Sequence, residues 1–163
     1  DVPVGEPGRL LVRGPTGCRY LADPRQAKYV EDGWNVTGDT FRMDADGYFW
    51  YVARSDDMIV SAGYNISGPE VENALLTHPA VKECAVLGVP DEQRGQIVKA
   101  FVVPADGVVA DAALVKQLQD HVKLTIAPYK YPRAVEFIDA LPRTATGKLQ
   151  RYRLRERAAG ASA

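Results

Sequence analysis

The chain has 163 residues, of which 46% are hydrophobic and 25% are charged, and its formal net charge is -1. This composition is ordinary for a globular protein, and the near-neutral charge gives no overall attraction to nucleic acid or to a membrane surface. Cys18 and Cys84 are too few to brace a fold of this size, so they favour a reducing, cytoplasmic location, although one disulfide between them stays open. No apolar run reaches membrane-spanning length, and the first residues show no signal-peptide pattern.

Residues 1–53 contain short strand patterns separated by turns. We predict a strand over Arg9–Arg13 and a hairpin turn at Asp44–Gly47. This part has few long apolar elements, so it could hardly build a core of its own. Because the first residue is Asp1 rather than Met, we expect the β-rich tail of a larger domain.

Two polar side chains in this part could bind a nucleotide. Asp39 follows Thr37 and Gly38, and a carboxylate in this position can accept two hydrogen bonds from a vicinal diol such as a ribose. Arg54 lies 15 residues later, so a hairpin could return its guanidinium fork to the same edge. The alternatives are an aspartate that closes a surface turn and a surface salt bridge worth about 0–1 kcal/mol.

A polar connector separates two parts of different character. Residues 54–57 read Arg-Ser-Asp-Asp between two apolar strand patterns, which is typical of an exposed linker. We therefore predict a β-strand tail of a larger domain over residues 1–54 and a separate α+β domain over residues 55–163.

The second part alternates strands and helices. Met58–Val60 is a short strand pattern, and Ser61–Ile66 is a glycine-centred turn or hairpin. Ser67 and Glu70 form a capping box for one helix, and Asp111 caps another. The remaining elements are strands at 81–89, 97–103 and 134–138, an extended segment at 128–133 and a helix at 152–159. We expect a short hairpin and a three-stranded sheet flanked by helices.

One lysine stands in a loop of small hydroxylated residues near the C-terminus. Thr144, Thr146 and Gly147 favour a turn, and Lys148 at its tip is a movable cation with three donors for phosphate or carboxylate oxygens. The alternative is a solvated surface loop. Residues 143–157 hold five Arg and one Lys against one Glu, which favours a solvated helical face over a nucleic-acid surface.

Four sequence blocks together resemble the C-terminal part of the adenylate-forming superfamily, which comprises acyl- and aryl-CoA synthetases, peptide-synthetase adenylation domains and beetle luciferases. The blocks are Thr37-Gly38-Asp39, Arg54-Ser55-Asp56-Asp57, Ser61-Ala62-Gly63-Tyr64-Asn65 followed by Gly68-Pro69-Glu70-Val71-Glu72, and Pro142-Arg143-Thr144-Ala145-Thr146-Gly147-Lys148. The resemblance covers essentially the whole chain and is nearest to benzoate, aminobenzoate and medium-chain acyl-CoA ligases.

The resemblance implies a mobile C-terminal domain that turns on the large N-terminal one. Asp39 would bind the ribose hydroxyls of ATP and of the acyl-adenylate, and Arg54 would help to hold the same nucleotide. Asp56 would be the hinge. Lys148 would reach the carboxylate oxygen and the α-phosphate during adenylation, as the catalytic residue.

The same resemblance implies a coenzyme A site. The loop Ala62-Gly63-Tyr64 would replace Lys148 after the domain turns and would line the pantetheine tunnel, while Arg94 would contact the CoA nucleotide. The implied cofactors are ATP and CoA, with Mg2+ in the full enzyme but without metal ligands in this chain. The implied partners are an aromatic or medium-chain carboxylic acid and the missing N-terminal domain, without nucleic acid or membrane.

Two other functions stay open. The chain could belong to an adenylation domain that loads a carrier protein, or it could be an isolated nucleotide- or CoA-binding module without activity. The family's Gly/Ser/Thr-rich phosphate loop and its acyl pocket are absent from this sequence. We therefore expect the chain alone to be inactive in adenylation.

Overall fold

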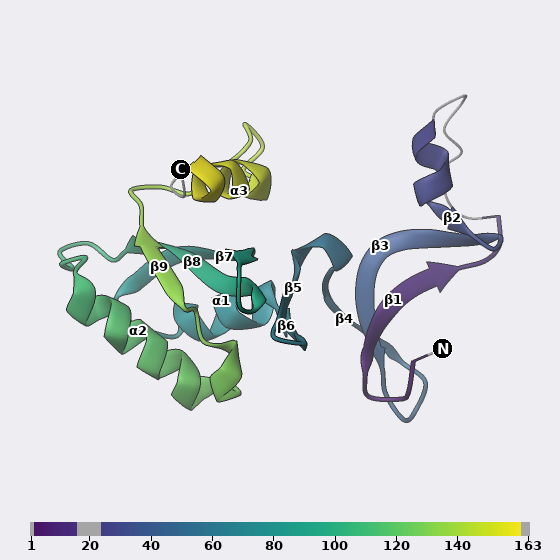
Figure 1. Ribbon diagram of the computed structural model, residues 1–163, viewed down its shortest axis with the longest axis horizontal. Helices are drawn as coiled ribbons and strands as arrows, with labels where there is room; N and C mark the ends of the chain where they lie inside the picture. Colours follow the sequence, from purple (N-terminus) through teal and green to yellow (C-terminus); the bar gives the residue numbers. More distant parts are fainter. Residues whose placement is uncertain (1, 16–23, 161–163) are drawn as a thin grey trace. The chain divides into compact units, whose positions relative to one another are not determined.

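The computed structural model describes residues 2–15 and 24–160, and Cys18 lies outside them. The chain divides into two compact units, residues 1–56 and residues 57–163 (Figure 1). None of the helices in the described part of the chain is long and apolar enough to cross a membrane.

The first unit is a small antiparallel sheet. Its elements are β1 (Pro7–Val12), η1 (Pro24–Lys28), β2 (Val30–Glu31), β3 (Trp34–Met43) and β4 (Phe49–Arg54), and they are followed by the turn η2 (Ser55–Asp57). β3 pairs with each of the other three strands. The predicted turn at Asp44–Gly47 joins β3 to β4, and Asp44 Oδ1 accepts hydrogen bonds from the backbone N–H of Asp46 and Tyr48.

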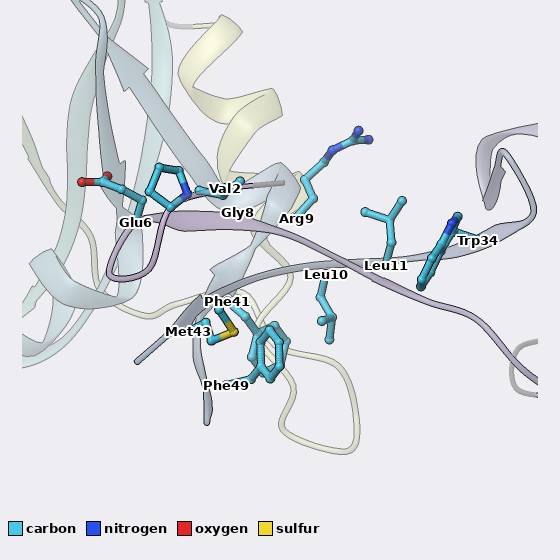
Figure 2. Close-up of a pocket in the computed structure, with 11 residues that line it drawn as sticks. Val2, Glu6, Gly8, Arg9, Leu10, Leu11, Trp34, Phe41, Met43 and Phe49 are labelled. Carbon is cyan, nitrogen blue, oxygen red and sulfur yellow. The ribbon is translucent and has the colours of Figure 1, made fainter. Parts of the chain in front are cut away.

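The described residues of the first unit form almost no core. Ala53 is their only buried hydrophobic side chain, whereas Phe49, Trp50 and Tyr51 on β4 are more than half exposed. A groove of about 610 Å³ opens along β1 and β3, and Figure 2 shows Leu10, Met43 and Phe49 gathered on one side of the β1 ribbon. For the described residues, the expectation that this part could hardly build a core of its own is confirmed.

The second unit begins with a hairpin and continues as a three-stranded sheet with helices. Its elements are β5 (Met58–Ser61), β6 (Tyr64–Ser67), α1 (Gly68–Leu76), β7 (Val81–Asp91), β8 (Gly95–Pro104), α2 (Ala112–Thr125), η3 (Pro128–Lys130), β9 (Ala134–Phe137) and α3 (Arg151–Gly160). The sheet order is β7-β8-β9, antiparallel between the first two strands and parallel between the last two. The predicted α+β fold is confirmed.

Alternation along the strands places helices on both faces of this sheet. Val86 and Ala100 face a core shared with α1 and α2, which contribute buried residues such as Leu75 and Leu118. Their neighbours Ala85, Leu87, Phe101 and Val103 face the other way and pack against Leu154 and Ala158 of α3. A period of two along β7 and β8 therefore sorts the helices into two layers (Figure 1).

The two predicted helix caps have different outcomes. Asp111 Oδ1 accepts a hydrogen bond from Leu114 N at 2.9 Å, so α2 is capped as expected. Ser67 is the N-cap of α1 but its side chain makes no capping bond. The Glu70 carboxylate instead accepts hydrogen bonds from the Lys130 ammonium at 2.6 and 2.7 Å. The predicted capping box is therefore wrong, because Glu70 pairs with a lysine that is distant in the sequence.

The segment before β9 also differs from its prediction. Residues 128–133 were expected to be extended, but Pro128–Lys130 form the 3-10 turn η3. Lys130 N donates to Ala127 O at 2.9 Å, and a proline in the first position of a helical turn forgoes only an N–H that has no partner there. This turn presents Tyr129 to the neighbouring hairpin.

Candidate functional site

Asp39 and Arg54 lie opposite each other on β3 and β4. The strand register pairs the two residues directly, and Arg54 Nη1 lies 3.1 Å from Asp39 Oδ1. The side chains are 53% exposed for Arg54 and 28% exposed for Asp39, so both remain accessible to a ligand. The predicted return of Arg54 by a hairpin is confirmed, while the binding of a nucleotide by this pair stays a prediction.

The residues before Asp39 fix the backbone around this pair. Thr37 Oγ1 donates to Leu10 O on β1 at 2.9 Å and accepts from Asp39 N at 3.2 Å. Gly38 has a φ of 78°, and a Cβ added there would lie 3.0 Å from Arg54 Nη2. The glycine therefore leaves room for the guanidinium to lie across the strand.

In the full-length enzyme, Gly38→Ala is expected to lower the free energy of unfolding by about 1 kcal/mol or more, since it adds positive-φ strain and a contact with Arg54. Urea unfolding of the full-length enzyme followed by circular dichroism measures this loss. The matched control is Gly47→Ala, with a φ of 85° and nothing within 4 Å of an added Cβ. Equal losses in the two variants would contradict the crowding by Arg54.

Residues 55–57 join the two units. The Asp56 side chain is 71% exposed and lies 3.8 Å from Arg54 Nε. Asp57 is the first residue of the second unit, and its side chain is only 16% exposed. The boundary between the units therefore falls between one exposed and one shielded carboxylate, and the hinge role of Asp56 stays a prediction.

The loop Ala62-Gly63 is the two-residue turn of the β5–β6 hairpin. Its residues have φ values of 49° and 83°, and Ser61 pairs with Tyr64 across it. Two positive φ values are the signature of a type I′ turn, which suits the twist of a short hairpin and favours glycine in the second position. A Cβ added at Gly63 would meet nothing within 4 Å, so this position faces open space.

Arg94 lies beside this turn. Its carbonyl accepts a hydrogen bond from Ala62 N at 2.9 Å, and its Nε donates to Ser61 Oγ at 3.4 Å. On the same hairpin the ring of Tyr64 stacks on Tyr129, with 4.5 Å between centroids. The second unit thus brings together the four residues expected at a CoA site, Ala62, Gly63, Tyr64 and Arg94.

The sequence did not predict that Tyr129 lies against this hairpin. Tyr129 is 40% exposed on η3, and only the fold brings it against Tyr64. Its place in a segment rich in tyrosine and lysine was a weak signal, because nothing in the sequence indicated which element would face the hairpin.

Lys148 projects from a tight hairpin. Thr144 N donates to Lys148 O at 2.8 Å, Lys148 N donates to Thr144 Oγ1 at 3.0 Å, and Arg143 Nη1 donates to Gly147 O at 2.9 Å. The side chain of Lys148 is exposed, and its ammonium makes no hydrogen bond or ion pair with any residue that the structure describes. A fixed backbone therefore carries a cation that is available to a ligand.

The second unit holds the lysine hairpin and the glycine turn in different places. In Figure 1 the hairpin of residues 143–149 lies beside α3, well apart from the β5–β6 turn. No group of three or more His, Cys, Asp or Glu side chains that could hold a metal ion occurs among the described residues. The arrangement offers one exposed cation and one open backbone turn on separate parts of one small unit.

A family model matches a large part of the second unit. Residues 70–148 match the AMP-binding enzyme C-terminal domain. The chain contains an AMP-binding enzyme C-terminal domain. The match begins at Glu70 in the first turn of α1 and ends at Lys148.

Relatives of this AMP-binding C-terminal domain are acyl-CoA ligases. The uncharacterized acyl-CoA ligase YtcI of Bacillus subtilis is 48% identical over 157 residues, covering 94% of this chain and 30% of that protein. Human mitochondrial acyl-coenzyme A synthetase ACSM5 is 49% identical over 164 residues, covering 94% of this chain and 28% of that protein. The chain therefore spans about a third or less of these curated relatives.

A solved structure has the same fold over the same stretch. The crystal structure of the anthranilate CoA ligase AuaEII in complex with anthranoyl-AMP superimposes with a TM-score of 0.82 and 42% sequence identity. The match covers 99% of this chain and 32% of that chain. The structural neighbour is thus an adenylate-forming CoA ligase.

Proposed function

We propose that the chain is the C-terminal part of an acid–CoA ligase. The full enzyme converts a carboxylate, ATP and CoA into acyl-CoA, AMP and pyrophosphate through an acyl-adenylate. The observation that carries this proposal is the separation of Lys148 from the Gly63 turn on one small unit, which provides two different faces for two half-reactions. The acyl-CoA ligase relatives and the anthranoyl-AMP complex support it.

In the first half-reaction the carboxylate attacks the α-phosphorus of ATP and pyrophosphate leaves. Negative charge grows on the phosphoryl oxygens, and the Lys148 ammonium stabilises that charge more in the transition state than in the ground state. Asp39 accepts hydrogen bonds from the ribose hydroxyls, and Arg54 holds Asp39 in place while it contacts the nucleotide. Mg2+ would be held by the ATP phosphates and by the rest of the enzyme.

In the second half-reaction the CoA thiol attacks the acyl carbon and AMP leaves. The thiol must approach through a narrow channel, and the bare backbone at Gly63 keeps that channel open. Arg94 and Tyr64 flank the turn and bind CoA. The C-terminal domain changes faces by rotating at Asp56, where few residues need to absorb the change in backbone angles.

The exposed apolar groove of the first unit supports the proposal that this chain is part of a longer polypeptide. An apolar groove lined by Leu10, Phe41 and Phe49 is costly to leave in water, and the remaining part of the enzyme would cover it. That part would also supply the phosphate loop and the acid pocket. The acid is aromatic or medium-chain, and anthranilate in the structural neighbour favours an aromatic one.

The purified 163-residue chain is expected to show no acid-dependent exchange of pyrophosphate into ATP, because it would supply Lys148, Asp39 and Arg54 while the phosphate loop and the acid pocket would lie in the rest of the enzyme. The measurement uses radiolabelled pyrophosphate with benzoate, anthranilate and octanoate. The full-length enzyme is the positive control, and exchange above background with the chain alone would contradict this division of labour.

Free CoA separates the ligase from a carrier-protein loading domain. A ligase releases a soluble acyl-CoA when the full-length enzyme receives acid, ATP and CoA. A loading domain consumes ATP but leaves CoA unacylated. If the full-length enzyme adenylates the acid but forms no soluble thioester, the ligase hypothesis is wrong and the hypothesis of a carrier-protein loading domain remains.

A further inference from the structure

Arg151 is held by two carboxylates directly behind the lysine hairpin. It is the first residue of α3 and lies three positions after Lys148. Its Nη1 and Nη2 donate to the two carboxylate oxygens of Glu72 at 2.8 and 3.0 Å, and its Nε lies 3.3 Å from Asp57 Oδ2. All three donor nitrogens of the guanidinium fork therefore face an acceptor.

The cluster is shielded and its carboxylates have further partners. The side chains of Arg151, Glu72 and Asp57 are 19%, 14% and 16% exposed. Glu72 Oε1 also accepts from Val86 N at 2.8 Å, and Asp57 Oδ1 accepts from Arg155 Nη2 at 2.8 Å. Burial alone would lower the pKa of Arg151, but its hydrogen bonds and charge interactions with Glu72 and Asp57 outweigh burial and raise it.

This cluster links four parts of the second unit. Asp57 is its first residue and directly follows Asp56, Glu72 lies on α1, Val86 lies on β7, and Arg151 opens α3. Between Lys148 and Arg151, Gln150 N donates to Pro142 O at 2.8 Å, so the base of the lysine hairpin is closed next to the arginine. The chain thus has a short polar path from the domain boundary to the lysine.

The basic helix is explained by the same contacts. Arg151 and Arg155 bind carboxylates inside the unit, and Arg157 Nε donates to Glu136 Oε1 at 2.6 Å. Charges that are already paired in this way are not available to phosphates. These three of the four arginines of α3 therefore contribute to the architecture of the unit.

We propose that Arg151 is the positioning residue for Lys148, because it fastens the helix behind the lysine hairpin to Asp57 at the domain boundary. This inference rests on the proposed function. With the link in place, rotation at Asp56 carries the lysine hairpin as a rigid part of the domain. Without it, apolar packing of Leu154 and Ala158 still holds α3, but the hairpin gains freedom at the start of the helix.

The test compares the two half-reactions in the full-length enzyme. Arg151→Met is expected to lower the kcat of acid-dependent pyrophosphate exchange roughly 10- to 100-fold, since a small misplacement of a catalytic group costs that much. The KM for ATP and thioester formation from supplied acyl-adenylate should stay at wild-type values. Arg151→Lys should give an intermediate rate, because an ammonium keeps the charge but cannot bridge both carboxylates.

The matched control is Arg157→Met, which removes an arginine from the same helix and breaks its ion pair with Glu136. It should change neither half-reaction. Hydrogen exchange should be faster over residues 143–153 in the Arg151→Met enzyme and unchanged over β8. If Arg151→Met does not fold, Arg151→Lys decides the question through the same split between the half-reactions.

Two outcomes would overturn the inference. One is pyrophosphate exchange within about twofold of wild type in Arg151→Met, and the other is an equal loss of both half-reactions in every Arg151 variant. Lys148→Ala separates this from a failure of the proposed function. If the Lys148→Ala enzyme keeps pyrophosphate exchange, the proposed function is wrong. If the Lys148→Ala enzyme loses pyrophosphate exchange and the Arg151→Met enzyme keeps it, only the proposed role of Arg151 is wrong.

Discussion

Replacing Lys148 with alanine in the full-length enzyme should reduce acid-dependent pyrophosphate exchange by at least about 100-fold, the usual cost of removing a donor that stabilises transition-state charge. The ammonium has no partner among the described residues, so its removal breaks no ion pair there and should not unfold the unit. Thioester formation from supplied acyl-adenylate should continue at the wild-type rate, because under the proposed function the lysine serves only the first half-reaction.

Both half-reactions must be measured on the same preparation. Pyrophosphate exchange reports adenylation, and liberation of AMP from acyl-adenylate and CoA reports thioester formation. Lys82→Ala is a suitable control, because Lys82 is an exposed lysine of the same unit that pairs only with Asp106 in the described structure. A Lys148→Ala enzyme that loses both half-reactions equally would refute the assignment of one face to each step.

Gly63→Leu should have the opposite effect, blocking thioester formation by about 100-fold or more while leaving pyrophosphate exchange near wild type. The φ of 83° adds strain of about 1 kcal/mol for any residue with a Cβ, which a folded domain can tolerate. Space around the position is open, so the leucine side chain extends outward into the path proposed for the thiol. Steric exclusion, rather than loss of a contact, is the expected cause.

A substitution at a second glycine distinguishes backbone strain from steric exclusion of the CoA thiol. Gly107 has a φ of 80°, faces open space and lies between β8 and α2, away from the hairpin. Gly107→Leu should leave both half-reactions intact. Normal turnover with CoA in the Gly63→Leu enzyme would overturn the tunnel assignment, and a similar loss in Gly107→Leu would point to strain in the unit.

Local patterns predicted most of the fold. The Asp44–Gly47 turn, the glycine-centred hairpin before α1 and the Asp111 cap each depend on residues within a few positions of one another. The sequence carries these signals directly, since turn and cap chemistry is local. The prediction that Asp39 and Arg54 lie at the same edge was confirmed for the same reason, because a single hairpin brings them together.

Long-range contacts account for what the sequence did not reveal. Glu70 left its expected capping role because Lys130, 60 residues away, lies next to α1 in the fold. Arg151 and Glu72 are separated by 79 residues, so no local pattern predicts their pairing. The arginine-rich helix after Lys148 has a largely exposed face, as the sequence predicted, but the carboxylates that pair with Arg151, Arg155 and Arg157 come from distant parts of the chain.

The polypeptide passes only once from one unit to the other, at the bond between Asp56 and Asp57. A single covalent tether keeps the second unit at a high effective concentration with respect to the first, of the order of millimolar for a short linker. Cutting that bond would turn an internal rearrangement into an encounter between two molecules. Catalysis by the cut enzyme would then depend on dilution, and adding excess C-terminal fragment would restore it.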